Sequence, residues 1–320
     1  MTPEDTPFFA INCMENHSRS MQSIANPEEA VRVYLEQAIS DNTRKAYQAD
    51  LLHYAAWGGE IPSTPETLVQ YLVAHAGVLS VATLVRRVAA IAKAHSLQGL
   101  ASPTTSELVR LTMRGIKRKE GKPQSQVAPL VKEDLIVTLA AIPDDLRGCR
   151  DRALLLTGFC AALRRSELCR VKREDIQLTG EGIILTLPRS KTDQTGEGRK
   201  IGIPFGRGKI CPVQRMQDWL SRAGITAGYI FCGIDGNKVS ATPLSDRSIS
   251  NIIKARVAKV GLNPDLYSGH SLRAGLATSA AAEGIPSHKI RAQTGHKSDA
   301  MLARYIRDGS LFNGNAAALF

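Results

Sequence analysis

Several features that define other classes of protein are missing from this sequence. No uninterrupted apolar run among its 320 residues reaches the roughly eighteen that a membrane-spanning helix needs. The N-terminus carries acidic residues where a secretory signal carries basic ones, and its apolar run is too short. We therefore expect a cytoplasmic protein that has no membrane partner.

Cysteine is present without a recognisable pattern. The six cysteines form no Cys-x-x-Cys pair and have no histidines at ligand spacing. Cys160 and Cys169 lie in apolar stretches, as buried free thiols do. We expect reduced thiols, with neither a disulfide framework nor a zinc site. A metal-dependent nuclease is also disfavoured, because the chain shows no cluster of carboxylates.

Acidic residues are fewer than basic ones. Lys and Arg total 41 against 30 Asp and Glu, which gives a net charge of +11. A surplus of this size suggests a polyanionic partner, most commonly nucleic acid. Ten Lys or Arg lie between residues 247 and 307, and a shorter basic cluster comprises Arg110, Arg114, Lys117, Arg118, Lys119 and Lys122. Clustering favours phosphate contacts, although a solvated helix face would explain either cluster taken alone.

The N-terminal third of the chain has the apolar spacing of helices. Residues 1–25 show no periodicity and are interpreted as a flexible leader. Helix starts are predicted at about residues 26, 42, 63 and 80, and a fifth helix from 105 to 119. No strand pattern interrupts them. Residues 26–119 are therefore predicted to form an all-helical domain.

A polar segment with Gly and Pro, residues 120–128, is the predicted linker. Beyond it, residues 129–320 mix helical and strand patterns and predict an α+β domain. Two β-rich runs, Ile183–Leu187 and Lys200–Ile203, indicate a hairpin. Helices are predicted at 132–142, 149–170, 212–222, 246–260, 271–283, 286–293 and 298–307. The expected fold is thus mainly α with a small β component, and two such modules suit a clamp around duplex DNA.

Chemically capable residues gather after residue 160, in Leu163–Leu168, Arg189–Thr192, Gly269–Arg273, and Gly295–His296 followed by Tyr305. Cleaving a phosphodiester without a metal requires a nucleophile, stabilisation of charge on the phosphate oxygens and a proton for the leaving oxygen. Arginines grip phosphate by forked hydrogen bonds, and histidines move protons near neutral pH. Lysine is a plausible acid, and a tyrosyl phosphate ester conserves bond energy for rejoining.

These segments resemble the tyrosine recombinase (phage integrase) family, with details similar to its Cre-type branch. That family has, in order, an Arg-x-[Ser/Ala]-Glu-[Leu/Ile] box, a lysine at a β-hairpin, a His-x-x-Arg box, a Gly-His or Gly-Trp, and a final tyrosine. The helical region is similar to the family's core-binding domain, which often begins with Asn-Thr-x-x-Ala-Tyr, found here at Asn42–Tyr47. The resemblance covers roughly residues 26–310.

The resemblance implies six catalytic residues, namely Arg164, Lys191, His270, Arg273, His296 and Tyr305. The two arginines would hold the scissile phosphate, and the two histidines would assist by hydrogen bonding and proton transfer. The lysine would protonate the leaving oxygen, and the tyrosine would form a 3′-phosphotyrosyl link. Family members need no metal, nucleotide or other cofactor. The implied partners are double-stranded DNA with inverted-repeat half-sites and a homo-tetramer on two duplexes, with no small-molecule substrate.

Each assignment has a structural alternative. Arg165 is adjacent to Arg164, and one of the two could be a surface charge; the offset to Glu167 selects Arg164. Tyr229 and Tyr267 are the alternative nucleophiles, and the spacing from His296 favours Tyr305. The expected role of Glu167 is to orient its neighbours, and that of His288 is a surface residue. The apolar tail from Ser310 to Phe320 is expected to dock on a neighbouring subunit.

Two other functions share parts of this pattern. A non-catalytic DNA-binding regulator on the same fold would have no need of the tyrosine. A relaxing topoisomerase of the type IB kind uses similar chemistry. The short chain and the Cre-like motifs favour a site-specific recombinase, and recombinant products from a tetramer would separate it from a topoisomerase.

Overall fold

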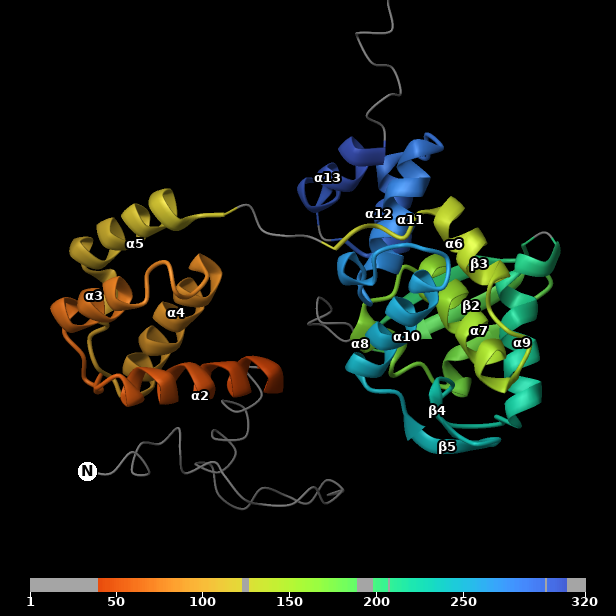
Figure 1. The fold of residues 1–320 in the computed structure, drawn as a ribbon, viewed down its shortest axis with the longest axis horizontal. Coiled ribbons are helices and arrows are strands. Elements are labelled where there is room, and N and C mark those ends of the chain that lie inside the picture. The colour runs from red at the N-terminus through yellow and green to blue at the C-terminus, as the bar shows by residue number, and fades with distance from the viewer. Residues whose placement is uncertain (1–39, 123–126, 189–197, 207, 297, 310–320) are drawn as a thin grey trace, which may run out of the picture. The chain divides into compact units, whose positions relative to one another are not determined.

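The computed structural model describes residues 40–122, 127–188, 198–206, 208–296 and 298–309. The predicted leader, the predicted helix start at residue 26, Lys191 and the C-terminal tail lie outside these residues. The chain divides into two compact units, residues 1–124 and residues 125–320, shown in Figure 1. Each unit has a hydrophobic core of its own.

The smaller unit is a set of helices, as predicted. It consists of α2 (Asp41–Ala56), α3 (Pro65–Ala74), α4 (Val81–Leu97) and α5 (Glu107–Glu120). Polar residues start two of the helices, since the hydroxyls of Thr64 and Ser80 accept hydrogen bonds from main-chain N–H groups in the first turn. Apolar faces then meet around fully buried residues such as Leu68, Leu72 and Leu84.

The larger unit contains eight α-helices within its described residues (Figure 1). They are α6 (Lys132–Ala140), α7 (Leu146–Cys160), α8 (Arg165–Leu168), α9 (Pro212–Ala223), α10 (Asp246–Ala258), α11 (Ser271–Ala282), α12 (Ser287–Thr294) and α13 (Asp299–Gly309). Helix α7 packs against α9 and α11, and α13 packs along α11. The two C-terminal helices are thereby held near the end of α7.

Two small antiparallel sheets complete the larger unit. Strands β2 (Gly182–Leu187) and β3 (Arg199–Pro204) pair as the predicted hairpin, and β1 (Ile176–Leu178) adds to the other edge of β2. A second sheet pairs β4 (Cys232–Asp235) with β5 (Lys238–Pro243). The hairpin prediction is confirmed, while β1, β4 and β5 were not predicted.

The predicted single helix over 149–170 is wrong. Helix α7 ends at Cys160, the chain turns at Ala162, and α8 begins at Arg165. Ala162 has a φ of 48°, a left-handed conformation that costs a non-glycine residue energy. The turn has a consequence for the site, because it places Arg164 at the N-cap of α8.

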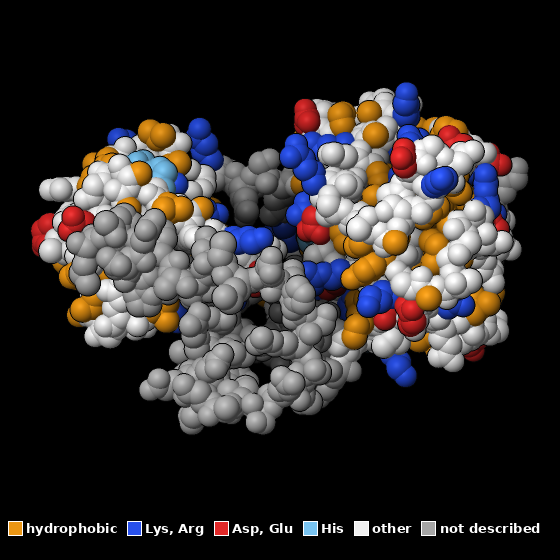
Figure 2. Space-filling model, turned by 90° about the horizontal axis from the view of Figure 1, so that it is seen from below, with side chains coloured by type: hydrophobic (Ala, Val, Ile, Leu, Met, Phe, Trp, Pro, Cys, Tyr) orange, Lys and Arg blue, Asp and Glu red, His pale blue; other side chains and the backbone are white. Residues whose placement is uncertain are grey.

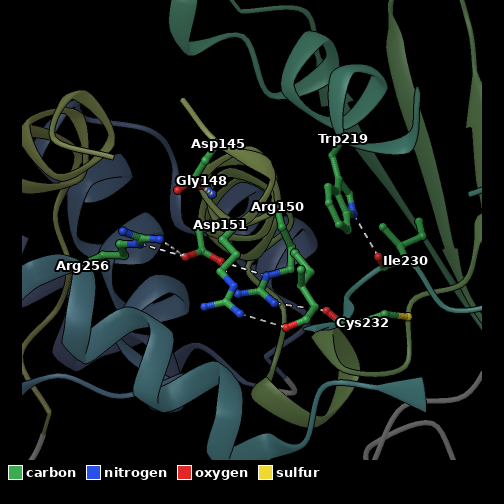
Figure 3. A network of polar contacts seen from close by, with 10 residues as sticks. Asp145, Gly148, Arg150, Asp151, Trp219, Ile230, Cys232 and Arg256 are labelled. Carbon is green, nitrogen blue, oxygen red and sulfur yellow. Dashed lines mark hydrogen bonds and ion pairs between the residues drawn. The ribbon is translucent and has the colours of Figure 1, made fainter. Parts of the chain in front are cut away.

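A buried carboxylate ties three elements of the larger unit together (Figure 3). Asp151 on α7 accepts hydrogen bonds from Arg150 at 2.8 and 3.0 Å and from Arg256 on α10 at 2.6 and 2.8 Å. Arg150 also donates to the carbonyl of Cys232 on β4, at 3.2 Å. One carboxylate shared by two guanidinium groups fixes α7 against α10. The guanidinium of Arg256 therefore makes a structural contact with a buried residue.

Lys and Arg side chains lie on both units in the face that Figure 2 shows. On α5, the basic cluster predicted from the sequence is exposed: Arg110, Arg114, Lys117, Arg118 and Lys119. Among the described residues, no helix combines the length and the apolar character needed to cross a membrane.

Candidate active site

The first predicted arginine is held by the carboxylate three residues further on. Glu167 is buried, and its two oxygens accept hydrogen bonds from the main-chain N–H of Arg164 at 2.8 Å and from its Nη1 at 2.6 Å. The side chain of Arg164 is thus oriented at the start of α8, as the sequence led us to expect of Glu167.

The neighbouring arginine has a different environment. Arg165 donates from Nε to Asp246 at 3.1 Å and from Nη1 to the hydroxyl of Ser250 at 3.3 Å, both on α10. Its aliphatic carbons cover Gly269, where a Cβ would lie only 2.7–2.9 Å away. Arg165 therefore braces the loop that leads into α11 and does not join Arg164.

The second predicted arginine is almost entirely buried. Arg273 lies in the first turn of α11, is 1% exposed, and donates from Nη1 to the carbonyl of Ala162 at 2.8 Å. Burial, followed by the positive charge of Arg164, lowers its pKa to about 10. The turn that breaks α7 from α8 therefore supplies the carbonyl that orients Arg273.

The predicted nucleophile lies beside the first predicted histidine. The hydroxyl of Tyr305, on α13, is 3.3 Å from Nε2 of His270, which caps α11. Desolvation of the imidazole, followed by the charges of Arg273 and Arg164, lowers the pKa of His270. A neutral histidine in this position can accept the proton of a phenol.

The second predicted histidine also lies next to this tyrosine. His296 follows Gly295, which ends α12 in the left-handed conformation with a φ of 66°. Its Nδ1 is 2.7 Å from the hydroxyl of Thr294, and its ring centroid is 5.9 Å from that of Tyr305. The pKa of His296 is lowered to about 4, mainly by burial and next by the positive charge of Arg273. His296 is therefore neutral at physiological pH.

A third arginine, which the sequence analysis missed, completes the group. Arg199 is the first residue of β3, and its Nη1 donates to the carbonyl of Gln293 at 3.3 Å. Gln293 in turn donates to the carbonyls of Cys160 and Gly202, at 2.7 and 3.1 Å. Only the position of Arg199 at the hairpin end opposite Leu187 could have pointed to it in the sequence.

Five of the six predicted residues are thus brought together, and the sixth, Lys191, lies outside the described residues. The alternative tyrosines lie elsewhere. Tyr267 is buried, which raises the pKa of its phenol, and the ring of Tyr229 is covered by the ammonium of Lys172 at 5.3 Å. His288 is exposed on α12, as expected.

The cluster is positively charged and largely buried, and it has the phenol of Tyr305 beside it. Three guanidinium groups, from Arg164, Arg199 and Arg273, share the single carboxylate of Glu167. Such a group fits an anion, and its hydrogen-bond donors suit phosphate oxygens. No group of three or more His, Cys, Asp or Glu side chains in the described part of the chain is placed to bind a metal ion. A hollow of about 600 Å³ between α2 and α4 contains none of these residues.

Comparison with known families decides the class. The model of the phage integrase family matches residues 130–310. The chain belongs to this family. It is 39% identical over 294 residues to the integrase/recombinase xerD homolog of Selenomonas ruminantium, covering 88% of this chain and 86% of the relative. It is 27% identical to recombinase cre of Escherichia phage P1, covering 85% of each.

Solved structures have the same fold. A XerH site-specific recombinase bound to its palindromic difH substrate matches with a TM-score of 0.63 and 17% identity, covering 85% of this chain and 76% of that one. A lambda integrase tetramer bound to a Holliday junction matches with a TM-score of 0.60 and 18% identity, covering 88% and 76%. The predicted fold class and the predicted class of enzyme, a tyrosine site-specific recombinase, are confirmed.

Proposed function

We propose that this recombinase cleaves and rejoins DNA through a 3′-phosphotyrosyl intermediate in which Tyr305 is the nucleophile. The observation that carries the proposal is the 3.3 Å contact between the Tyr305 hydroxyl and Nε2 of His270, next to the guanidinium groups of Arg164 and Arg273. A nucleophile, a neutral base and two phosphate-binding groups lie within one site, as phosphoryl transfer requires.

In the cleavage step, the phenol oxygen of Tyr305 attacks phosphorus as its proton passes to Nε2 of His270. The new O–P bond forms while the bond from phosphorus to the 5′ oxygen breaks. Arg164 and Arg273 hydrogen-bond to the non-bridging oxygens, and His296 assists by hydrogen bonding and proton transfer. Lys191 gives the departing 5′ oxygen its proton. No metal or cofactor is needed.

Rejoining reverses these steps on an exchanged strand. The free 5′ hydroxyl attacks the phosphotyrosine, Lys191 takes back a proton, and His270 returns one to the departing phenolate. Because one phosphate ester replaces another at each step, strand exchange consumes no external energy source. The proton acceptor in one direction is the donor in the other.

The proposed substrate is double-stranded DNA with inverted-repeat half-sites, and both units contribute to its binding. The exposed Lys and Arg side chains of α5 and the arginine cluster around Arg273 supply positive charge to phosphates. A tetramer on two duplexes is proposed by analogy with the lambda integrase tetramer on a Holliday junction. Action in the cytoplasm, on DNA, follows from the same proposal.

Covalent trapping tests the nucleophile. Nicked suicide substrates drawn from DNA flanking the gene are mixed with the protein, and an adduct that survives denaturant is sought. The wild-type protein is expected to form it, in EDTA as well as without. Tyr305→Phe keeps the ring that lies against His296 but removes the attacking oxygen, so the adduct should fall by at least about a thousandfold.

Tyr229→Phe is the matched control, because the ring under Lys172 is kept and only a distant hydroxyl is lost. It should form the adduct at the wild-type rate. An adduct that persists in Tyr305→Phe would identify a different nucleophile. Tight DNA binding without any adduct from the wild-type protein would favour a non-catalytic regulator.

A further inference from the structure

Arg199 occupies an unusual place for an arginine. It begins β3, directly across the hairpin from Leu187, and its guanidinium reaches over Gly295, the residue before His296. A Cβ at Gly295 would come within 2.1 Å of Nη1 of Arg199, so a larger residue there would displace the guanidinium. The hairpin therefore delivers a positive charge directly to the turn that carries the second site histidine.

Among the described residues, no carboxylate is hydrogen-bonded to the guanidinium of Arg199. Other arginines of this unit bond to carboxylates: Arg150 and Arg256 to Asp151, and Arg164 to Glu167. Arg199 has only the carbonyl of Gln293, and its Nε and Nη2 are buried without an acceptor among the described residues.

The neighbours of Arg199 make this arrangement more unfavourable in the free protein. Glu167 is near enough to stabilise its charge, but burial and the positive charge of Arg164 outweigh it and lower the pKa of Arg199. Arg199 in turn is one of the charges that lower the pKa of Arg273 and His296. Unpaired buried charge is normally selected against, and it persists at functional sites where a ligand compensates it.

We propose that Arg199 is a third arginine of the phosphate site, which supplies positive charge to the scissile phosphate from behind Arg164, Arg273 and His296. A phosphodiester brings one negative charge to this cluster, and the charge on its non-bridging oxygens increases as the tyrosine attacks. Because Nε and Nη2 of this half-buried arginine are shielded from water, its field acts in part across a medium of low dielectric constant and is weakly screened. The proposal rests on the proposed function and adds a residue to it.

A structural role is the competing explanation, since the bond to Gln293 also ties β3 to α12. The two roles predict different effects of an Arg199 substitution on charged and neutral substrates. If Arg199 acts through its charge, removing that charge will matter for a phosphodiester and much less for a neutral methylphosphonate linkage. If it only holds the hairpin in place, both linkages will suffer equally.

The test measures single-turnover adduct formation by Arg199→Met and Arg199→Lys on suicide substrates with either linkage at the cleavage position. We expect Arg199→Met to lose about a hundredfold on the phosphodiester. On the methylphosphonate, the rate of adduct formation by Arg199→Met should lie within about threefold of the wild-type rate, because a neutral linkage gains little from the lost charge. Arg199→Lys retains a charge and should stay within about tenfold of wild type on the phosphodiester.

Thermal unfolding without DNA provides a second readout. Replacing an unpaired buried charge by an apolar side chain should leave the melting temperature unchanged or raise it, whereas a structural tie predicts a fall. The matched control is Arg173→Met. Arg173 is half-buried beside β1 and donates one hydrogen bond to a main-chain carbonyl, that of Ile176 at 3.1 Å, so both adduct rates should be unchanged.

Equal losses on the two linkages, together with a lower melting temperature, would overturn the proposal and leave Arg199 a structural residue. A wild-type adduct rate in Arg199→Met on the phosphodiester would overturn it as well, while leaving the role of Tyr305 intact. If the wild-type protein forms no adduct on both the phosphodiester and the methylphosphonate, the proposed function is overturned and this inference with it.

Discussion

At the scale of single residues, the charge state of the site histidines follows from their neighbours. Two imidazoles lie among three guanidinium groups, and burial adds to the cost of a further positive charge. Both histidines therefore rest as neutral bases. The arginines, by contrast, keep their charge even where burial lowers the pKa, as for Arg273 at about 10. Neutral and positively charged side chains are thus combined within a common environment.

The depressed pKa of His296 has a consequence for stability. Its pKa is about 4 in the folded protein against 6.5 for an unperturbed histidine. Between these values the unfolded chain binds a proton that the folded protein does not, so stability falls as the pH is lowered through this window. His296→Asn, which can still bond to Thr294, should lose less stability than wild type between about pH 7 and about pH 5.

Urea unfolding followed by circular dichroism at the two pH values measures this difference. His288→Asn is the control, because His288 is exposed on α12 and its replacement should leave the pH dependence as in wild type. A pH dependence in His296→Asn equal to that of wild type would mean that folding does not lower the pKa of His296. His270 and His53, whose pKa values are also lowered, contribute to the dependence that remains in the variant.

At the scale of elements, the position of α11 depends on a glycine. Gly275 lies two residues after Arg273, and a Cβ there would come within 1.9 Å of the carbonyl oxygen of Leu130. The main-chain N–H of Leu130 donates to the carbonyl of Ser271 at 2.9 Å, so this segment lies directly along the helix. A side chain at residue 275 would displace α11, and Arg273 and His270 with it.

Gly275→Ala should therefore destabilise the protein by about 1–3 kcal/mol, the usual cost of overpacking, despite the better helix propensity of alanine. Gly115→Ala is the matched control, since Gly115 is also helical but has nothing within 4 Å of its added Cβ. It should stabilise by about 0.5–1 kcal/mol. Chemical denaturation of both variants checks the pair, and stabilisation of Gly275→Ala would show that the helix adjusts freely.

The helices and the hairpin were predictable because local signals determine them. Caps such as Ser80, an N1 proline such as Pro65 and the alternation of β2 and β3 lie within a few residues of the elements they define. The break after α7 was not predictable from such signals. Ala161-Ala162-Leu163 favour helix, and the turn depends on Arg273, over a hundred residues later, which bonds to the carbonyl of Ala162.

The residues of the candidate site also differ in whether local sequence signals reveal them. Arg164, His270, Arg273, His296 and Tyr305 belong to short motifs with recognisable spacing, so the sequence alone could nominate them. Arg199 belongs to no motif, and its place depends on the space that Gly295 leaves. Its importance could be inferred only once the two segments were seen together. Strand β5 was missed for a local reason, because Lys238–Pro243 is half polar and Val239 is its only large apolar residue apart from the terminal proline.

At the scale of the whole molecule, each unit has its own core. Fully buried leucines such as Leu72 in the smaller unit and Leu155 in the larger one belong to separate clusters. The described residues that join them, 121–122 and 127–131, contain no helix or strand. A chain built in this way is expected to unfold one unit at a time.

Differential scanning calorimetry of the free protein should therefore resolve two transitions that respond to different substitutions. Leu72→Ala should lower only the transition of the smaller unit, and Leu155→Ala only that of the larger unit, each by the equivalent of about 2–5 kcal/mol. Because Tyr305 and its neighbours lie in the larger unit, Leu155→Ala should also reduce adduct formation near its lowered transition, whereas Leu72→Ala should act through DNA binding. A single transition shifted equally by both substitutions would mean that the units stabilise each other in the free protein.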